Sequence, residues 1–96
     1  MITSFSDQAT EDIFHGADTK AARSVSKDTW PTARRKLDAL NAAHESKDLQ
    51  SPPGNRLEKL KGRLAGKWSI RVNDQYRIVF KFENGSALQV QVTDYH

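Results

Sequence analysis

The 96-residue chain contains no cysteine, which excludes a disulfide framework and a thiolate metal site. It also has no apolar run near the roughly 20 residues that a membrane-spanning helix needs. Its first residues lack the basic region and apolar stretch of a signal peptide. No internal repeat or low-complexity tract is present. We therefore expect a cytoplasmic protein with one domain over residues 1–96, because this length supports a single hydrophobic core.

The charge balance is only mildly basic. Fifteen Lys and Arg residues against twelve Asp and Glu residues give a net charge of +3 and a pI near 9.4. Such an excess suits an anionic partner such as nucleic acid without requiring one.

The first half of the chain predicts helices. Residues 1–5 suit a short edge strand, and a helix capped by Ser6 or Ser4 is expected to run to about Phe14. Residues 17–27 are polar and weakly patterned, which predicts a loop.

A second, stronger helix is predicted to begin at Asp28 or Thr29, with Pro31 in its first turn, and to fade near Lys47. Its apolar face recurs at three- and four-residue steps: Ala33, Leu37, Leu40 and His44. Basic residues 34–36 are interpreted as a solvated helix face, with RNA contact as the alternative.

The second half of the chain predicts strands. Residues 51–55 cannot continue a helix, and 56–62 suit a short extended piece with a basic face. Apolar residues then alternate over 68–72, 76–82 and 87–93. The fold class is therefore α+β, with helices packed on one face of a twisted, mainly antiparallel sheet of three to four strands.

The first hairpin is predicted to turn through residues 73–75. This register keeps apolar side chains opposite one another, pairing Ile70 with Ile78 and Arg71 with Arg77. Like charges directly opposite are destabilising, so this arginine pair needs a compensating anion. A bound phosphate would serve, and so would neutralisation by Asp94 or Glu58.

The second hairpin is predicted to turn through residues 84–86, which keeps Phe82 opposite Leu88 on the apolar face. A β-bulge would have the same effect. A two-residue Asn-Gly turn would instead place Lys81 opposite Leu88, and we reject it despite the turn signal.

The chain ends in a titratable trio. The predicted register places Thr93 beside Arg77, so Asp94, Tyr95 and His96 should emerge at the arginine end of the sheet. General acid–base catalysis on a phosphodiester needs such a mixture, and an imidazole with a pKa of about 6.5 is its best acid or base. The alternative is an exposed, frayed tail.

Three segments together resemble a known family. Residues 53–62, residues 66–78 and the terminal Asp-Tyr-His are similar to the HigB toxins of the RelE superfamily of bacterial toxin–antitoxin systems. The resemblance covers most of residues 53–96. It implies a RelE-like fold and a ribosome-dependent endoribonuclease that cuts messenger RNA in the ribosomal A site, without a metal or other cofactor. It also implies a HigA-like helix-turn-helix antitoxin that binds the operon's own operator DNA, the 70S ribosome as a partner, and no membrane.

The resemblance also assigns roles to residues. The family's functional positions fall on Asp94, Tyr95, His96, Arg77 and Lys61. Some relatives carry a catalytic histidine where this chain has Glu58.

These residues suit attack by the substrate's own 2′-OH on the adjacent phosphorus. His96 would act as base or acid, Asp94 would orient its imidazole, and Tyr95 would donate a proton or stack on a base. Glu58 would be a second acid–base group or an ion-pair partner of Arg77.

The basic residues would bind the RNA backbone. Two arginines, Arg71 and Arg77, would clamp the phosphate and stabilise the charge of the transition state. Lys59, Lys61 and Arg56 would line the RNA path. Two other functions fit the same basic face: a module that blocks translation without cutting, and a co-repressor that acts with its antitoxin on DNA.

Overall fold

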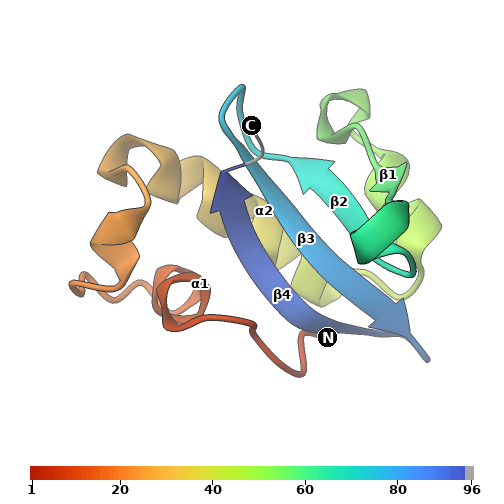
Figure 1. The fold of residues 1–96 in the computed structure, drawn as a ribbon, viewed down its shortest axis with the longest axis horizontal. Coiled ribbons are helices and arrows are strands. Elements are labelled where there is room, and N and C mark those ends of the chain that lie inside the picture. The colour runs from red at the N-terminus through yellow and green to blue at the C-terminus, as the bar shows by residue number, and fades with distance from the viewer. Residues whose placement is uncertain (95–96) are drawn as a thin grey trace.

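Two helices pack on one face of a four-stranded antiparallel sheet, which confirms the α+β prediction (Figure 1). The computed structural model describes residues 1–94. The helices are α1 (Gln8–Phe14) and α2 (Trp30–Ala42), and the strands are β1 (Glu58–Lys59), β2 (Trp68–Arg71), β3 (Tyr76–Glu83) and β4 (Ser86–Asp94). The strands follow one another in chain order across the sheet. Within residues 1–94, no helix has the length and apolar character needed to cross a membrane.

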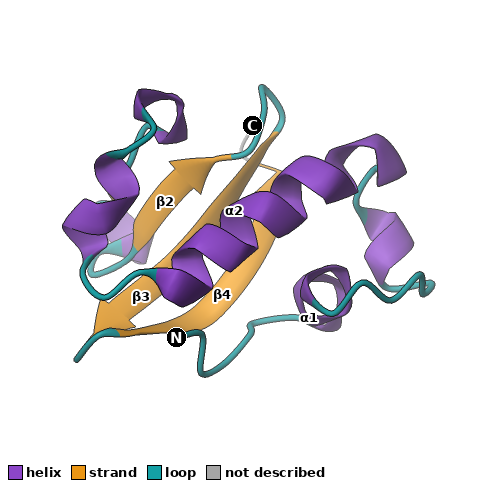
Figure 2. Cartoon of the chain, turned by 180° about the vertical axis from the view of Figure 1, so that it is seen from behind, coloured by secondary structure: helices purple, strands orange, loops and turns teal. Residues whose placement is uncertain are grey.

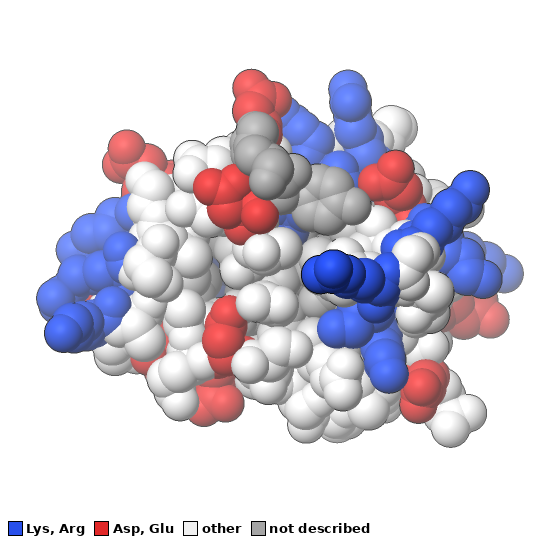
Figure 3. Space-filling model, in the orientation of Figure 1, with Lys and Arg blue, Asp and Glu red and all other residues white. Residues whose placement is uncertain are grey.

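The core lies between α2 and the sheet. Seen from behind, α2 crosses the strands diagonally and α1 lies beside the outer strand β4 (Figure 2). The predicted helix face is confirmed for Ala33, Leu37 and Leu40, which are fully buried. The opposite face of the sheet points toward the viewer in Figure 3. Lys and Arg side chains gather there at two sides, over the segment before α2 and around β1.

Helix α1 begins differently from the prediction. Its cap is Asp7, whose carboxylate accepts a hydrogen bond of 2.9 Å from the Thr10 backbone N–H. Ser4 and Ser6 do not cap it, because both hydroxyls bond to the backbone of Gln89 in β4. A carboxylate at this position also complements the positive end of the helix dipole.

Helix α2 ends at Ala42, and the prediction that it continues to Lys47 is wrong. The Asp48 carboxylate accepts 3.0 Å hydrogen bonds from the N–H groups of His44 and Glu45. This capping arrangement starts a separate 3-10 turn and draws the chain out of the helix. His44 is therefore exposed and does not belong to the apolar face.

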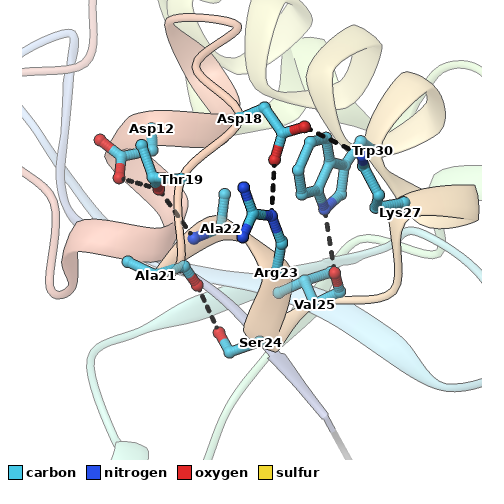
Figure 4. A network of polar contacts seen from close by, with 10 residues as sticks. All are labelled: Asp12, Asp18, Thr19, Ala21, Ala22, Arg23, Ser24, Val25, Lys27 and Trp30. Carbon is cyan, nitrogen blue, oxygen red and sulfur yellow. Dashed lines mark hydrogen bonds and ion pairs between the residues drawn. The ribbon is translucent and has the colours of Figure 1, made fainter.

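Residues 17–27, predicted as a loop, are short 3-10 turns and connections held by a polar network (Figure 4). The Thr19 hydroxyl donates to Asp12 over 2.6 Å, and Asp18 pairs with both Arg23 and Lys27 at 2.9 Å. The segment is also anchored to the core, since the Trp30 indole N–H donates to the Val25 carbonyl at 3.0 Å. Val25 and Trp30 are buried.

The first hairpin has the predicted register. Ile70 pairs with Ile78 and Arg71 pairs with Arg77. The turn is fixed by Asn73, whose side-chain oxygen accepts hydrogen bonds from the backbone N–H groups of Gln75 and Tyr76.

The second hairpin differs from the prediction of a turn through residues 84–86, which is wrong. Its turn is the two-residue Asn84-Gly85, with φ values of 51° and 78°. Positive φ at both positions is the mark of a type I′ turn, whose twist matches that of the strands. Lys81 therefore lies opposite Leu88, and Phe82 pairs with Ala87, which is the buried residue.

A β-bulge in β4 restores the apolar register beyond the turn. Between the Lys81–Leu88 and Val79–Gln91 pairs, β4 has one more residue than β3, and Gln89 adopts a left-handed φ of 53°. The predicted Arg77–Thr93 pairing is confirmed past this point.

The N-terminal segment protects the bulged edge. It forms parallel bridges from Ile2 to Ala87 and from Phe5 to Val90, as the prediction of a short edge strand for residues 1–5 suggested. Between the bridges, Ser4 accepts the Gln89 N–H at 2.8 Å and Ser6 donates to its carbonyl at 2.9 Å. The polar backbone groups of the bulge are thereby satisfied.

We predict that Gln89→Gly stabilises the protein. An exposed non-glycine residue with left-handed φ is strained, so glycine should raise the free energy of unfolding by about 0.5–1 kcal/mol. Gln91→Gly, at a regular position two residues on, should lower it instead. Urea unfolding of both variants measures this, and a loss of stability in Gln89→Gly would contradict the strain argument.

We predict an acid-sensitive contribution from Asp12. Hydrogen bonds from Thr19 and Gln8 lower the pKa of the Asp12 carboxyl. Stability from this group is present above the unfolded pKa of about 3.9 and is lost as pH falls through the lower folded pKa. Asp12→Asn should therefore differ most from wild type at neutral pH, with the two converging in acid. In thermal melts, Asp38→Asn, at an exposed position on α2, should show no such convergence.

Candidate functional site

Two rows of side chains cross the face of the sheet opposite α2. One row runs Arg71, Arg77, Thr93 over three adjacent strands. The neighbouring row, two residues along each strand, is Glu58, Ser69, Val79 and Gln91. Their strand neighbours Ile70 and Ile78 point into the core, so these rows lie on the other face.

Arg77 is the most firmly held of the predicted site residues. Its side chain is 13% exposed. The Nε–H donates to Ser69 Oγ at 2.9 Å, and Nη2 donates to the Arg56 carbonyl at 2.8 Å. Nη2 also lies 3.7 Å from the Glu58 carboxylate, so the ion pair predicted as one of two roles for Glu58 is present. The guanidinium is thus fixed from three sides.

Arg71 is more open. Its side chain is 33% exposed and its guanidinium pairs with the carboxylate of Asp74 in the hairpin turn. The two opposed arginines are therefore compensated by different acids, Glu58 for Arg77 and Asp74 for Arg71. Sequence reasoning named Glu58 but missed Asp74, although its position three residues after Arg71, across a tight turn, was a usable signal.

Ser69 is a second residue that the sequence did not single out. It is fully buried, unlike most serines, and its hydroxyl is the acceptor for Arg77. A small polar residue at a covered position of an alternating strand is the corresponding sequence signal.

Strand β4 ends at Asp94, at the end of the sheet that carries the two arginines. Asp94 pairs with Tyr76, is exposed, and accepts a 3.1 Å hydrogen bond from the Gln75 side-chain amide. The preceding residue, Thr93, lies opposite Arg77. Tyr95 and His96 lie outside the described residues, so their predicted roles stay predictions.

The remaining predicted RNA-binding residues lie in and beside the edge strand β1. Arg56, Lys59 and Lys61 are all exposed, and the Lys59 ammonium lies 5.7 Å from the centre of the Trp68 ring. Figure 3 shows basic side chains gathered on this side of the face. Arg56 has a left-handed φ of 46°, which turns its carbonyl toward Arg77.

The described site carries positive charge from arginine and lysine and negative charge from Glu58, Asp74 and Asp94. Among residues 1–94, no three His, Cys, Asp or Glu side chains come together as ligands for a metal ion. What the arrangement offers chemically is two arginines at directly opposed positions, the largely covered Arg77 and the more exposed Arg71, and guanidinium groups suit the binding of an anion.

Comparison with known proteins points to one family. The model of the family described as "RelE-like toxin of type II toxin-antitoxin system HigB" matches residues 3–96. Toxin HigB-1 of Vibrio cholerae is 42% identical over 88 residues, covering 92% of this chain and 90% of the relative. Endoribonuclease HigB of Proteus vulgaris is 32% identical over 96 residues, covering 100% of both chains.

A solved structure shows the same fold. The YoeB toxin in the heterotetrameric YoeB–YefM toxin–antitoxin complex from Staphylococcus aureus superposes with a TM-score of 0.62. The match covers 100% of this chain and 98% of the other at 23% identity. At this identity the likeness bears on the fold alone.

We predict that Ser69 matters more for stability than Glu58. Ser69→Ala removes the partner of a largely covered charged donor and should lower the free energy of unfolding by about 1–3 kcal/mol. Glu58→Gln weakens a longer contact to a side chain that is 59% exposed, and should change it by no more than about 1 kcal/mol. Urea unfolding of the two variants gives the ranking, and the reverse order would show that the ion pair is what holds Arg77.

Proposed function

This chain belongs to the HigB-like family of RelE-like toxins from type II toxin–antitoxin systems, and we propose that it acts as an endoribonuclease on messenger RNA. The relative from Proteus vulgaris, which is named an endoribonuclease and aligns over its whole length, supports this assignment. The observation that carries it in the structure is the pair of opposed arginines at the edge where β4 ends.

The arginine pair suits the charge that develops during phosphodiester cleavage. As a 2′-OH attacks the adjacent phosphorus, the phosphorane-like transition state gains negative charge on its non-bridging oxygens. Arg77, fixed by Ser69 and the Arg56 carbonyl, would meet this charge without reorganising. Arg71, more exposed, would bind the phosphate as the substrate arrives.

The chain terminus would supply the proton transfers. His96 takes the proton from the 2′-OH or delivers one to the leaving 5′-oxygen, and Asp94 orients its imidazole. Tyr95 donates a proton or stacks on a splayed base. The bond from phosphorus to the 5′-oxygen breaks, leaving a 2′,3′-cyclic phosphate and a 5′-hydroxyl. This chemistry uses protein side chains in place of a metal ion.

Glu58 has a different role in this scheme. Its carboxylate is paired with Arg77, which favours a positioning role over acid–base chemistry. The basic residues Arg56, Lys59 and Lys61 would follow the RNA backbone away from the reacting bond.

The ribosome completes the proposed site. A chain with few titratable groups gains from a partner that orients the message, since orientation alone can contribute several kcal/mol to a rate. We therefore propose cleavage in the A site of the 70S ribosome in the cytoplasm, with little cutting of free RNA. A HigA-like helix-turn-helix antitoxin would neutralise the toxin and link it to operator DNA. The toxin–antitoxin complex formed by the structural neighbour YoeB supports such a pairing.

We predict that wild type cuts a defined message at the A-site codon of 70S complexes and that His96→Ala does not, as read by primer extension. Loss of a general acid or base typically costs about 10²–10⁴-fold in rate. Arg71→Ala should also cut poorly, while Arg23→Ala, which removes one positive charge far from the site, should cut normally. Inhibited translation without cleavage by wild type would favour the blocking module. Equal cleavage by His96→Ala would move the chemistry to Glu58, Tyr95 and the arginines.

A further inference from the structure

A second basic feature is a cavity of about 250 Å³ between α2 and residues 52–55. Its lining is formed by Arg35, Lys36, Ala39, Pro52 and Asn55. Two of the five residues are cations and none is an acid. An open cavity with two positive charges and no carboxylate in its walls is suited to an anion.

Lys36 is held in place by a neutral partner. Its ammonium donates to the side-chain oxygen of Asn55, which is 1% exposed. The Asn55 amide nitrogen in turn donates to the carbonyls of Leu49 at 3.1 Å and Ser51 at 3.3 Å, so the amide cannot turn over without losing both bonds. The oxygen therefore faces Lys36 permanently, and the lysine is fixed at the cavity wall.

The positive charge of this cavity is uncompensated. Within the described part of the chain, neither Arg35 nor Lys36 takes part in an ion pair. Burial lowers the pKa of the Lys36 ammonium, and the nearby charges of Arg35 and Arg71 lower it further. A partly covered lysine beside two guanidinium groups is an unfavourable arrangement that a bound anion would relieve.

The cavity lies near one member of the arginine pair, because Arg71 is close enough to Lys36 to act on it electrostatically. The turn Pro53–Asn55, which ends at its wall, packs against β2 and leads directly into Arg56. The carbonyl of Arg56 is one of the acceptors that hold Arg77. Arg71, at the end of β2, is near enough to Lys36 to lower the pKa of its ammonium group. One strand of RNA could thus contact both the cavity and the arginine pair.

We infer that this cavity is a phosphate-binding subsite, in which Lys36 and Arg35 hold a backbone phosphate of the RNA away from the bond that is cut. The inference rests on the proposed function for the identity of the strand. Of the triplet at residues 34–36, only two side chains serve it, because Arg34 donates to the Ile13 carbonyl at 3.1 Å and faces α1. An RNA backbone is favoured over an acidic protein segment because the cavity lies near Arg71 and its wall residue Asn55 directly precedes Arg56, whose carbonyl holds Arg77.

The test uses a fluorescent 2′-O-methyl RNA oligonucleotide, which cannot be cut because its 2′-oxygen is blocked. Anisotropy at several salt concentrations should show that Lys36→Gln weakens binding several-fold and lowers the salt slope by about one, as expected for loss of one phosphate contact. Arg35→Gln, a change at an exposed position, should act in the same direction. Lys20→Gln, an equal loss of charge at an exposed site before α2, should leave the slope unchanged.

Several results would overturn the inference. Unchanged affinity and slope in both cavity variants would do so, as would failure of wild type to bind the oligonucleotide saturably. If the variants alter stabilisation by inorganic phosphate in thermal melts but not RNA binding, the cavity is a free-phosphate site. If they weaken only binding of the antitoxin, it is a protein contact. The same experiments separate the subsite from the proposed nuclease activity. If wild type cleaves at the A site but Lys36→Gln leaves RNA binding unchanged, only the subsite is refuted. If the cavity variants weaken RNA binding but wild type does not cleave, only the nuclease activity is refuted.

Discussion

Register between β3 and β4 is the constraint on which the rest of this structure depends. The Asn84-Gly85 turn starts the two strands one residue out of step with their apolar pattern, and the bulge at Gln89 corrects this. Without the correction, every side chain of β4 beyond the bulge would face the wrong side of the sheet. The correction places Val90 and Val92 in the core and Thr93 beside Arg77, so β4 ends at Asp94, one residue past the position opposite Arg77. The hydroxyls of Ser4 and Ser6 then stabilise the strained residue from outside.

The opposed arginines show how a cost in stability can prepare a site. Arg71 and Arg77 repel each other, and the fold compensates them with acids from two different segments, Glu58 in the edge strand and Asp74 in the turn. Both acids are largely exposed, at 59% for Glu58 and 100% for Asp74, so water screens both ion pairs. What the fold adds is orientation, since a buried hydroxyl and a backbone carbonyl hold Arg77 before any substrate arrives. Preorganised charge of this kind is the main way in which enzymes stabilise a transition state.

The segment between α2 and β2 connects the functional features of the molecule. It supplies Asn55 to the cavity, the Arg56 carbonyl to Arg77, and Glu58 to the same guanidinium. Strand β1 within it is only two residues long, so its hydrogen bonds alone would not hold it firmly. Burial of Leu60 and Asn55 secures it instead. Packing on β2 and polar contacts to Arg77 therefore reinforce each other, which ties the geometry of the site to the stability of this edge.

Local patterns in the amino-acid sequence predict the secondary-structure elements and much of the strand pairing. Alternation of apolar residues located the three long strands, three- and four-residue steps located the buried face of α2, and apolar matching paired Arg71 with Arg77. These features follow from local periodicity, which a sequence displays directly. The family resemblance was likewise carried by short motifs in residues 53–96.

The turn length, the helix ends and the long-range contacts could be read only from the tertiary structure. Periodicity assumes one register along a whole strand, so it could not choose between a longer turn and a tight turn followed by a bulge. The helix ends depended on which polar side chain bonds to the backbone N–H groups there. Asp7 caps α1 because Ser4 and Ser6 bond to Gln89, and Asp48 accepts the His44 N–H just after α2. The Arg56 carbonyl that accepts from Arg77, and the contact between Lys36 and Asn55, bring together residues whose sequence neighbours give no sign of the contact. Such contacts are set by how the layers pack, because long-range distances are not encoded in any local pattern.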